Sequence, residues 1–235
     1  MRWVGLGALL LLGAGVSCTS TYQVRHAPAS GFLGDYSQLQ TGGRGRPLLI
    51  YRDPDVDFTA YKRVQLDPVA GYIGAHSRLQ KIAPEDRQAL LNYFHATLRK
   101  RLAEDYELVD EAGPGVLRLR VAVTDAQGSK VAMDTLSTVV PVGLALSALQ
   151  KVTLGKTLTA GSVRIEAEAL DGATGKRLAA LVDERAGAKV SGRLDKWSKW
   201  QDARDAFDFW GERLQSRLAA LRAEKAQTGA KPARR

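Results

Sequence analysis

The segment GVLRLRVAVTD, residues 115–125, decides the fold class, and SVRIEAEALD, residues 162–171, repeats its pattern. In both segments apolar and polar side chains alternate. Because successive side chains of a β-strand point to opposite faces, the pattern predicts two antiparallel strands with one buried face and one face open to solvent. The apolar positions are Leu117, Leu119, Val121 and Val123, followed by Val163, Ile165, Ala167 and Ala169.

Further strands are expected on both sides of these two. The turn-forming segment DGATGK, residues 171–176, predicts a hairpin into RLAALVDER, residues 177–185. Earlier in the chain, short strands are expected in LLIY (48–51), in YKRVQLDPV (61–69) and in YELVD (106–110).

Two amphipathic helices are expected to cover the sheet. The first begins near Pro84, with acidic residues at its start and basic residues at its end, as the helix dipole favours. The second is C-terminal. The sequence thus predicts an α+β two-layer sandwich with a mainly antiparallel sheet. The apolar stripes are Leu91, Phe94, Leu98 and Leu102, then Trp200, Ala203, Phe207, Trp210, Leu214, Leu218 and Leu221.

A loop region precedes the first strand. In SGFLGDYSQLQ, residues 30–40, apolar side chains fall at helical spacing, which predicts a short turn of helix docked on the body. The next segment, TGGRGRP (41–47), is rich in glycine and arginine. It has neither a P-loop lysine nor a following helix, so we interpret it as a flexible loop and not a phosphate site.

The N-terminus has the organisation of a signal peptide. After Arg2, the stretch from Trp3 to Val16 carries no charge. As a helix it would span about 21 Å, which is short of the roughly 30 Å hydrocarbon core of a bilayer. A basic start, a short apolar run and small residues indicate a cleaved signal peptide over residues 1–17.

The single cysteine of the chain, Cys18, follows this run directly. Its context resembles a bacterial lipobox, although Gly15 stands where leucine is usual, and cleavage by ordinary signal peptidase is the alternative. An unpaired thiol in an oxidising compartment favours a covalent use, so we expect Cys18 to carry palmitate and diacylglycerol as a lipid anchor. In lipoproteins of this kind, aspartate after the cysteine marks inner-membrane retention. Thr19 therefore predicts the periplasmic face of the outer membrane.

More than half of the net charge of +9 lies at the two ends of the chain. Arg2 contributes one charge and residues 222–235 contribute four. We therefore expect a tether over 18–46, a periplasmic domain over 47–222 and a basic disordered tail over 223–235. An exported protein with this distribution is not expected to bind nucleic acid.

The segment TLSTVVPVGLALSALQKV, residues 135–152, is apolar on all sides between positions 139 and 149. It is too short to cross a bilayer. It is either a buried crossover helix or a surface that contacts a partner protein or lipid, and the two interpretations remain open. The candidate contact residues are Val139, Val140, Val142, Leu144 and Leu146.

No catalytic or metal-binding motif is present in the sequence. The spacing of His26, His76 and His95 suits no metal site. Asp53, Asp55 and Asp57 have calcium-loop spacing, but the required glycine and glutamate are missing, which favours a turn with capping aspartates. The fragment GKT (155–157) lacks the first P-loop glycine. We therefore expect no cofactor and no enzyme, while a site assembled only in three dimensions stays open.

Several segments together resemble a bacterial lipoprotein family, domain of unknown function 3313. They are SGFLGDYSQLQ, YKRVQLDPV, GPGVLRLRVAVTDA, STVVPVGLALS and VRIEAEALDGATGKRLAALVDERAG. The resemblance implies an envelope lipoprotein and supplies no catalytic residues. The expected function is that of an outer-membrane-anchored module that binds another envelope component, of unknown oligomeric state. The alternative is a periplasmic enzyme acting on cell-wall or lipid material.

Overall fold

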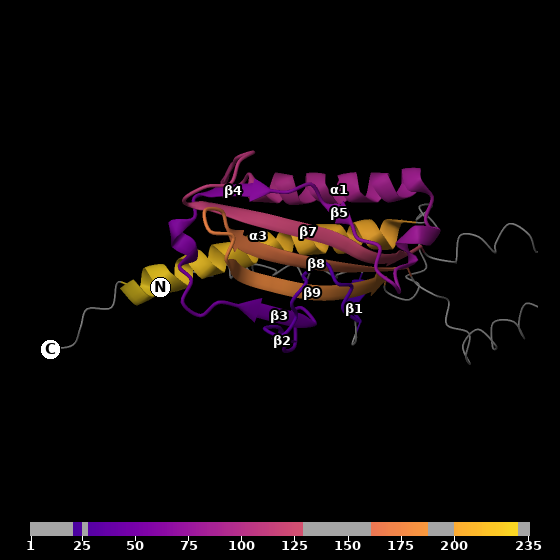
Figure 1. Cartoon of the computed structure of the whole chain (residues 1–235), viewed down its shortest axis with the longest axis horizontal. Helices are drawn as coiled ribbons and strands as arrows, with labels where there is room; N and C mark the ends of the chain where they lie inside the picture. The colour runs from indigo at the N-terminus through magenta and orange to yellow at the C-terminus, as the bar shows by residue number, and fades with distance from the viewer. Residues whose placement is uncertain (1–20, 25–27, 129–160, 188–199, 230–235) are drawn as a thin grey trace, which may run out of the picture.

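The computed structural model describes residues 21–24, 28–128, 161–187 and 200–229. In these ranges, nine strands form one mixed, mostly antiparallel sheet, and two long helices pack on one of its faces (Figure 1). The α+β fold expected from the sequence is confirmed. Among the described residues, no helix is both long enough and apolar enough to span a membrane.

Three long strands form the centre of the sheet. They are β7 (Val116–Gln127), β8 (Ser162–Asp171) and β9 (Arg177–Gly187), and they pair antiparallel in that order. The β8–β9 hairpin has the predicted turn, in which the amide of Asp171 donates to the carbonyl of Lys176 at 2.9 Å. The alternating segments therefore form the strands that the sequence predicted.

Short strands extend the sheet on both sides of this centre. On the β9 side lie β1 (Thr21–Gln23), β2 (Gln40–Thr41) and β3 (Leu49–Arg52), where both β1 and β3 pair antiparallel with β9. The tether range expected over 18–46 thus contributes β1 and β2 to the sheet. On the β7 side lie β4 (Arg63–Leu66), β5 (Ala70–Gly71) and β6 (Glu107–Leu108), in parallel pairings.

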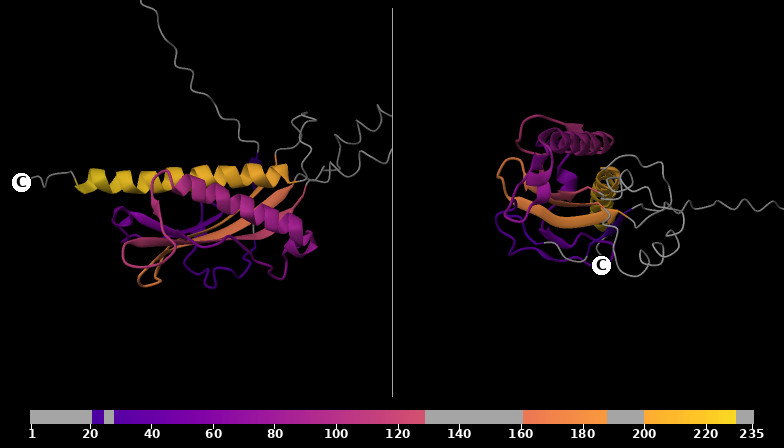
Figure 2. Two further views of the ribbon diagram at one scale, coloured as in Figure 1. Left: turned by 90° about the horizontal axis from the view of Figure 1, so that it is seen from above. Right: turned by 90° about the vertical axis from the view of Figure 1, so that its right-hand side faces the viewer.

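Helix α1 (Pro84–Leu102) begins and ends where the sequence predicted, and α3 (Gln201–Gly229) lies beside it over the sheet (Figure 2). Two short 3-10 turns, Phe58–Ala60 and Arg78–Lys81, join the strands. Because α3 continues to Gly229, the start of the predicted tail, 223–229, is helical.

The core lies between the sheet and the two helices. Phe94 of α1 stacks on Phe207 of α3 with ring centroids 4.4 Å apart, and Trp210 packs against both rings. Of the predicted stripe on α3, only Leu214 is half-buried. The other members are buried: Trp200, which directly precedes α3, and Ala203, Phe207, Trp210, Leu218 and Leu221 of the helix.

Candidate functional site

The face of the sheet opposite the helices carries charged side chains that are nevertheless buried. Glu166 is 0% exposed, Glu168 5% and Glu184 6%. The expectation that this face is open to solvent is therefore wrong. Alternation of polar residues shows which side chains share a face, but it does not show what covers that face.

An N-terminal segment, residues 28–39, covers this face, and we call it the strap. Its apolar side chains pack on Ala180 and Val182 of β9, with Leu33 buried. The predicted docking of this segment is confirmed, but the predicted helix is wrong. The strap is a series of turns, and Gly31 and Gly34 have φ of 104° and 70°, outside the helical region.

Glu166 of β8 binds the strap directly. Its two carboxylate oxygens accept from the backbone amide of Ser30 at 2.8 Å and from the hydroxyl of Tyr36 at 2.5 Å. Burial raises the pKa of the Tyr36 hydroxyl, and the hydrogen bond to Glu166 raises it further. The carboxylate therefore holds two strap positions six residues apart in sequence.

Glu168, one strand repeat further along β8, is paired with two arginines. Arg120 of β7 forms an ion pair with it, and the Nε of Arg177 donates to it at 2.9 Å. The two terminal nitrogens of Arg177 donate to the strap carbonyls of Leu33 at 2.6 Å and Asp35 at 2.7 Å. Arg177 thus connects a buried carboxylate to the backbone of the strap.

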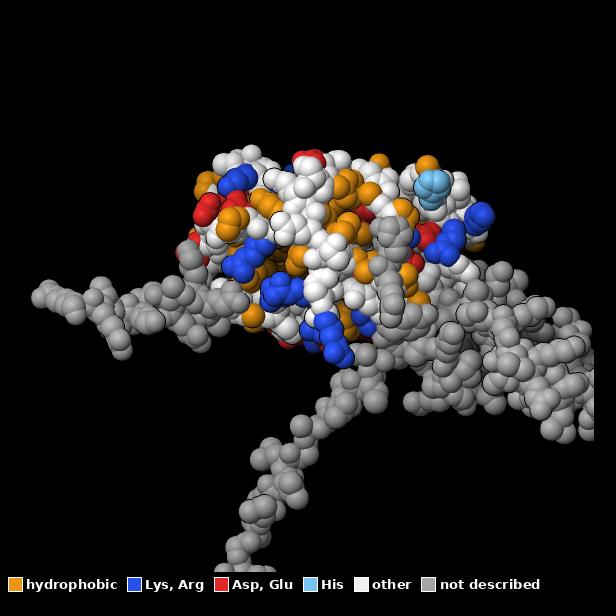
Figure 3. Space-filling model, turned by 90° about the horizontal axis from the view of Figure 1, so that it is seen from below, with side chains coloured by type: hydrophobic (Ala, Val, Ile, Leu, Met, Phe, Trp, Pro, Cys, Tyr) orange, Lys and Arg blue, Asp and Glu red, His pale blue; other side chains and the backbone are white. Residues whose placement is uncertain are grey.

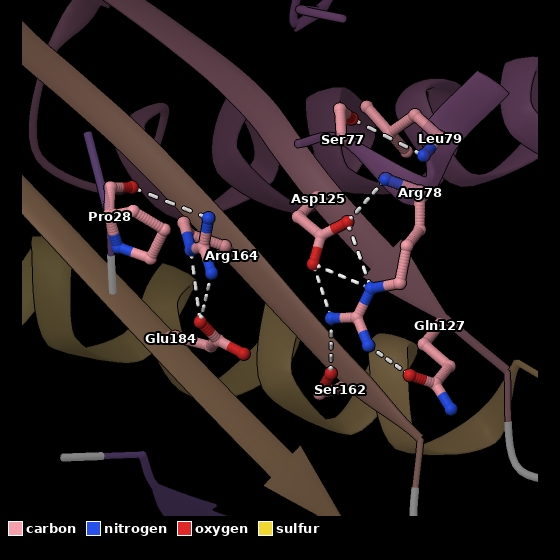
Figure 4. A network of polar contacts seen from close by, with 9 residues as sticks. All are labelled: Pro28, Ser77, Arg78, Leu79, Asp125, Gln127, Ser162, Arg164 and Glu184. Carbon is pink, nitrogen blue, oxygen red and sulfur yellow. Dashed lines mark hydrogen bonds and ion pairs between the residues drawn. The ribbon is translucent and has the colours of Figure 1, made fainter. Parts of the chain in front are cut away.

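At the start of the strap, Arg164 makes the corresponding link. Its guanidinium donates to Glu184 of β9 at 2.7 and 2.9 Å, and to the carbonyl of Pro28 at 3.3 Å (Figure 4). Charge-assisted bonds of this kind are stronger than neutral ones and depend on geometry. The strap is therefore fixed at its first residue as well as at its centre.

A second network fixes the 3-10 turn at Arg78 to the sheet. The carboxylate of Asp125, 2% exposed, accepts from the backbone amide of Arg78 at 2.7 Å and from its Nε at 2.9 Å. The same guanidinium reaches Gln127 and Ser162 (Figure 4). Its hydrogen bond to Asp125 raises the pKa of Arg78.

These charged groups pair with one another and with the backbone, and together they hold the strap and the 3-10 turn at Arg78 on the sheet. We call them the clamp. A general acid or base must reach a substrate proton, whereas the carboxylates of Glu166, Glu168 and Asp125 are each occupied by donors from the chain itself. Sequence analysis missed this clamp because the partners are far apart along the chain. The one available signal was the alternation of arginine and glutamate on the polar face of β7 and β8.

On the helix face, one buried carboxylate ties the first strand to the core. Asp183 of β9 accepts from the indole of Trp210 at 2.8 Å and from the side-chain amide of Gln23 at 2.8 Å. The same amide of Gln23 donates to the carbonyl of Arg46 at 2.6 Å. Strand β1 and the loop before β3 are thus joined to each other and to α3.

The principal candidate residues from the sequence lie outside the described residues. They are Cys18 and the five residues of the apolar segment, together with His26 and the GKT fragment. The lipid-anchor and contact-surface predictions therefore stay predictions. The five candidate contact residues of the apolar segment are Val139, Val140, Val142, Leu144 and Leu146.

The three aspartates after β3 form a turn, as predicted. Asp57 caps the 3-10 turn by accepting from the amide of Thr59 at 3.0 Å. Asp53 accepts from the amide of Asp55 at 3.0 Å and pairs with Lys176 at 2.6 Å. The hydrogen bond from Lys176 lowers the pKa of Asp53. The carboxylates serve the local fold.

The described histidines stand alone. His76 is exposed in a loop and His95 lies half-buried on α1, where burial lowers its pKa. Within the ranges that the structure describes, no three His, Cys, Asp or Glu side chains gather as a metal site.

An open hollow of about 540 Å³ borders α1, and its lining offers two cations but no paired acid and base. Its lining residues are Ala96, Arg99, Lys100, Ala103, Tyr106 and Leu108.

Comparison with known proteins places this arrangement in a family. A family model described as "Protein of unknown function (DUF3313)" matches residues 28–214. The matched range begins at the first residue of the strap and includes every strand of the sheet except β1. The chain is also 31% identical over 164 residues to the uncharacterized lipoprotein YdcL of Escherichia coli K12, covering 69% of this chain and 72% of the relative.

Solved structures give more distant similarities. A PelC dodecamer from Paraburkholderia phytofirmans matches with a TM-score of 0.39 at 13% identity, over 72% of this chain and 94% of that one. A minor lipoprotein from Acinetobacter baumannii matches with a TM-score of 0.33 at 12% identity, over 69% and 95%. At such scores we conclude nothing from them about function.

Proposed function

Since the chain belongs to the DUF3313 family and is related to a lipoprotein, we propose that it is an outer-membrane lipoprotein whose periplasmic domain binds another envelope component. Acyl chains on Cys18 hold it at the periplasmic face of the membrane. One observation carries this proposal. The only cysteine of the chain ends an apolar N-terminal run, in a chain that is 31% identical to a lipoprotein.

The position of β1 supports an anchor at Cys18. Thr21 opens β1 and pairs with Gly187 at the end of β9. Because β1 runs antiparallel to β9, the chain before Thr21 leaves the sheet at the edge where β9 ends. A lipid on Cys18 therefore attaches close to a fixed point of the folded domain.

The apolar segment around residues 139–149 is the proposed contact with a partner or with lipid. Its connection leaves β7 at Gln127 and returns at Ser162, and this pair of residues is in register across the sheet. Ser162 pairs in turn with Ala186, next to the start of β1. The connection therefore departs from the same end of the sheet as the proposed anchor, which favours a role at the membrane surface.

Replacement of the cysteine tests the anchor. Cys18→Ala should abolish labelling by a clickable palmitate analogue and release the protein from sedimented membranes. A Ser17→Ala variant keeps the cysteine and is the control, with labelling expected as in the parent. Continued labelling of Cys18→Ala would contradict the proposal.

The choice of membrane has its own test. In a density gradient, the parent should sediment with outer-membrane markers, and Thr19→Asp should move it to the inner membrane. Thr19→Ser is the control and should leave the distribution unchanged. A parent protein found with inner-membrane markers would refute the outer-membrane assignment while leaving the lipid anchor intact.

Crosslinking in native membranes tests the binding role. A stoichiometric protein partner is expected, and Val140→Ser with Leu144→Ser should remove it without changing the melting temperature. Ile73→Ser, at a side chain that is 48% exposed elsewhere, is the matched control. Loss of folding in the double variant would show that the segment is core, and absence of any partner would favour the periplasmic enzyme.

A further inference from the structure

The lipid anchor of the proposed function limits where the membrane can lie. Thr21 lies three positions after Cys18, and a fully extended chain over three residue steps spans at most about 11 Å. Thr21 is itself hydrogen-bonded into the sheet beside Gly187. Parts of the folded domain next to β1 are therefore held close to the lipid headgroups.

One basic loop lies directly beside β1. The arginine loop, Gly42–Pro47, joins β2 to β3, and its Arg44 and Arg46 side chains are exposed. The side-chain amide of Gln23 in β1 donates to the carbonyl of Arg46 at 2.6 Å. In Figure 3, Lys and Arg side chains lie in the lower half of the face that carries β2 and β3, and others lie at its upper left and at its right end.

The loop presents its charge without nearby compensation. From Tyr36 to Arg52 the chain contains no aspartate or glutamate. Within the described parts of the chain, no carboxylate forms an ion pair with Arg44 or Arg46. These two guanidinium groups are thus available to an external anion.

The loop also has a defined shape. The amide of Gly42 donates to the carbonyl of Leu48 at 2.9 Å, and the amide of Arg46 donates to Gly43 at 3.0 Å. A Cβ at Gly42 would overlap the carbonyl oxygen of Pro47, and Gly45 has a φ of 74°. The glycines thus permit a compact turn, and the flexible loop expected from the sequence is instead hydrogen-bonded to itself and to β1.

We infer that the arginine loop is a membrane-contacting surface, in which Arg44 and Arg46 bind the phosphates of acidic phospholipids next to the acylated cysteine. The inference rests on the proposed lipid anchor. Guanidinium groups bind phosphate with two parallel hydrogen bonds, and each basic residue near an anionic surface adds to the electrostatic attraction. That attraction extends over a Debye length of about 8 Å, comparable with the reach of the anchor.

The contact fixes the orientation of the domain. One acyl-bearing residue leaves a domain free to rotate about its attachment point, whereas a second contact beside it restricts that rotation. The end of the sheet where β7 and β9 finish and β8 begins then faces the membrane, and the far hairpin turn at 171–177 lies away from it. Position 173 lies in that hairpin turn, at the far end of β8 from Ser162, and provides a distant reference point.

Fluorescence quenching tests the contact in the acylated full chain. Because acylation consumes Cys18, Gly43→Cys provides a single thiol for an environment-sensitive dye, and a Cβ at position 43 has no heavy atom within 4 Å. The protein is placed in vesicles of phosphatidylethanolamine and phosphatidylglycerol that carry a headgroup quencher. Strong quenching is expected at position 43 and background quenching for Ala173→Cys.

Charge reversal then tests the role of the arginines. Arg44→Glu with Arg46→Glu should lose most of the quenching at position 43, and so should vesicles of phosphatidylcholine alone. The matched control is Lys62→Glu with Lys100→Glu, an equal change of charge at exposed positions near the opposite end of the sheet. That control should quench as the parent does.

The outcomes separate this inference from the anchor. A parent protein whose Cys18 reacts with the dye is not acylated, which overturns the proposed function. An acylated protein with equal quenching at positions 43 and 173 overturns only the membrane contact. Retention of acylated protein on purified sacculi, lost in the Arg44→Glu and Arg46→Glu variant and without quenching in vesicles, would assign the arginines to peptidoglycan and also overturn the inference.

Discussion

The two faces of the central sheet are both buried, but by different physical means. The helix face is covered by α1 and α3 through apolar contacts, with Phe94, Phe207 and Trp210 at their centre. The strap face is covered by residues 28–39 through the carboxylates and guanidinium groups of β7, β8 and β9. Apolar contact stabilises without regard to direction, whereas buried charges stabilise only the segment that pairs with them.

The comparison shows a division of roles within one sheet. Burial of apolar area supplies most of the folding free energy, and the helix face holds the larger apolar clusters. Removing two charges from water costs several kcal/mol, which their pairing returns only with correct geometry. The strap face therefore determines where the N-terminal segment lies more than it determines whether the domain folds.

The largest effect is expected on the helix face. Phe207→Ala removes a ring that is 0% exposed and stacked on Phe94, which should cost about 3–5 kcal/mol of unfolding free energy. Chemical denaturation measures it, with Phe207→Leu as a control expected to cost less because it removes less buried volume. A loss below about 1 kcal/mol for Phe207→Ala would show that this face is not the main source of stability.

An intermediate effect is expected on the strap face. Tyr36→Phe leaves one oxygen of the buried Glu166 without its donor, which should cost about 1–3 kcal/mol. The loss should appear mainly as faster hydrogen exchange in residues 28–39, with little change in α1 and α3. Ser37→Ala, at an exposed position of the strap, is the control. Equal acceleration in the helices would show that the two faces are not independent.

A smaller effect on folding stability is expected at alkaline pH, from Tyr61 at the edge of the helix-face core. Burial, together with the hydrogen bond to Asp171, raises the pKa of Tyr61 from 10.0 to about 12. A hydroxyl with a raised pKa in the folded state stabilises fully below pH 10, and its contribution is lost as the pH rises to 12. Tyr61→Phe should therefore flatten the fall of stability over this window. An unchanged slope in a pH series of denaturation curves would contradict the prediction.

The smallest effect is expected at the solvent side of the helix layer. Arg101 of α1 pairs with Glu212 of α3 at 3.1 Å, and the glutamate side chain is 61% exposed. Exposed pairs contribute about 0–1 kcal/mol, so Glu212→Ala should change the unfolding free energy by less than about 0.5 kcal/mol. A loss of unfolding free energy as large as that of Tyr36→Phe would mean that exposed polar pairs stabilise the domain as much as buried ones.

The same comparison explains what could be predicted from the sequence. The helix face follows from local periodicity, and the stripes on α1 and α3 were found because each helix carries its own pattern. The strap face depends on pairs such as Ser30 with Glu166, which are 136 residues apart in sequence. Single-sequence patterns do not contain such pairs, so the strap was expected to form a helix and the charged face to be solvated.

The arginine loop, too, could be predicted only in part from the sequence. The arginines of the loop at 42–47 were visible in the sequence, but their place beside β1 depends on the bond between Gln23 and Arg46. Likewise, the parallel pairing of β4 with β7 requires α1 to cross between them, which no local pattern specifies. Residue types were thus available from the sequence, and their neighbours were not.

The pairing of β1 and β3 with β9 has a consequence for the order in which the chain can fold. Both N-terminal strands find their neighbour between Arg177 and Gly187, more than 120 residues later along the chain. A nascent chain that has emerged only as far as β8 cannot complete this edge, and contacts so distant in sequence slow folding. The residues nearest the proposed anchor are therefore among the last to acquire their final neighbours, and a fragment that stops before Arg177 should leave them available to proteases and to other chains.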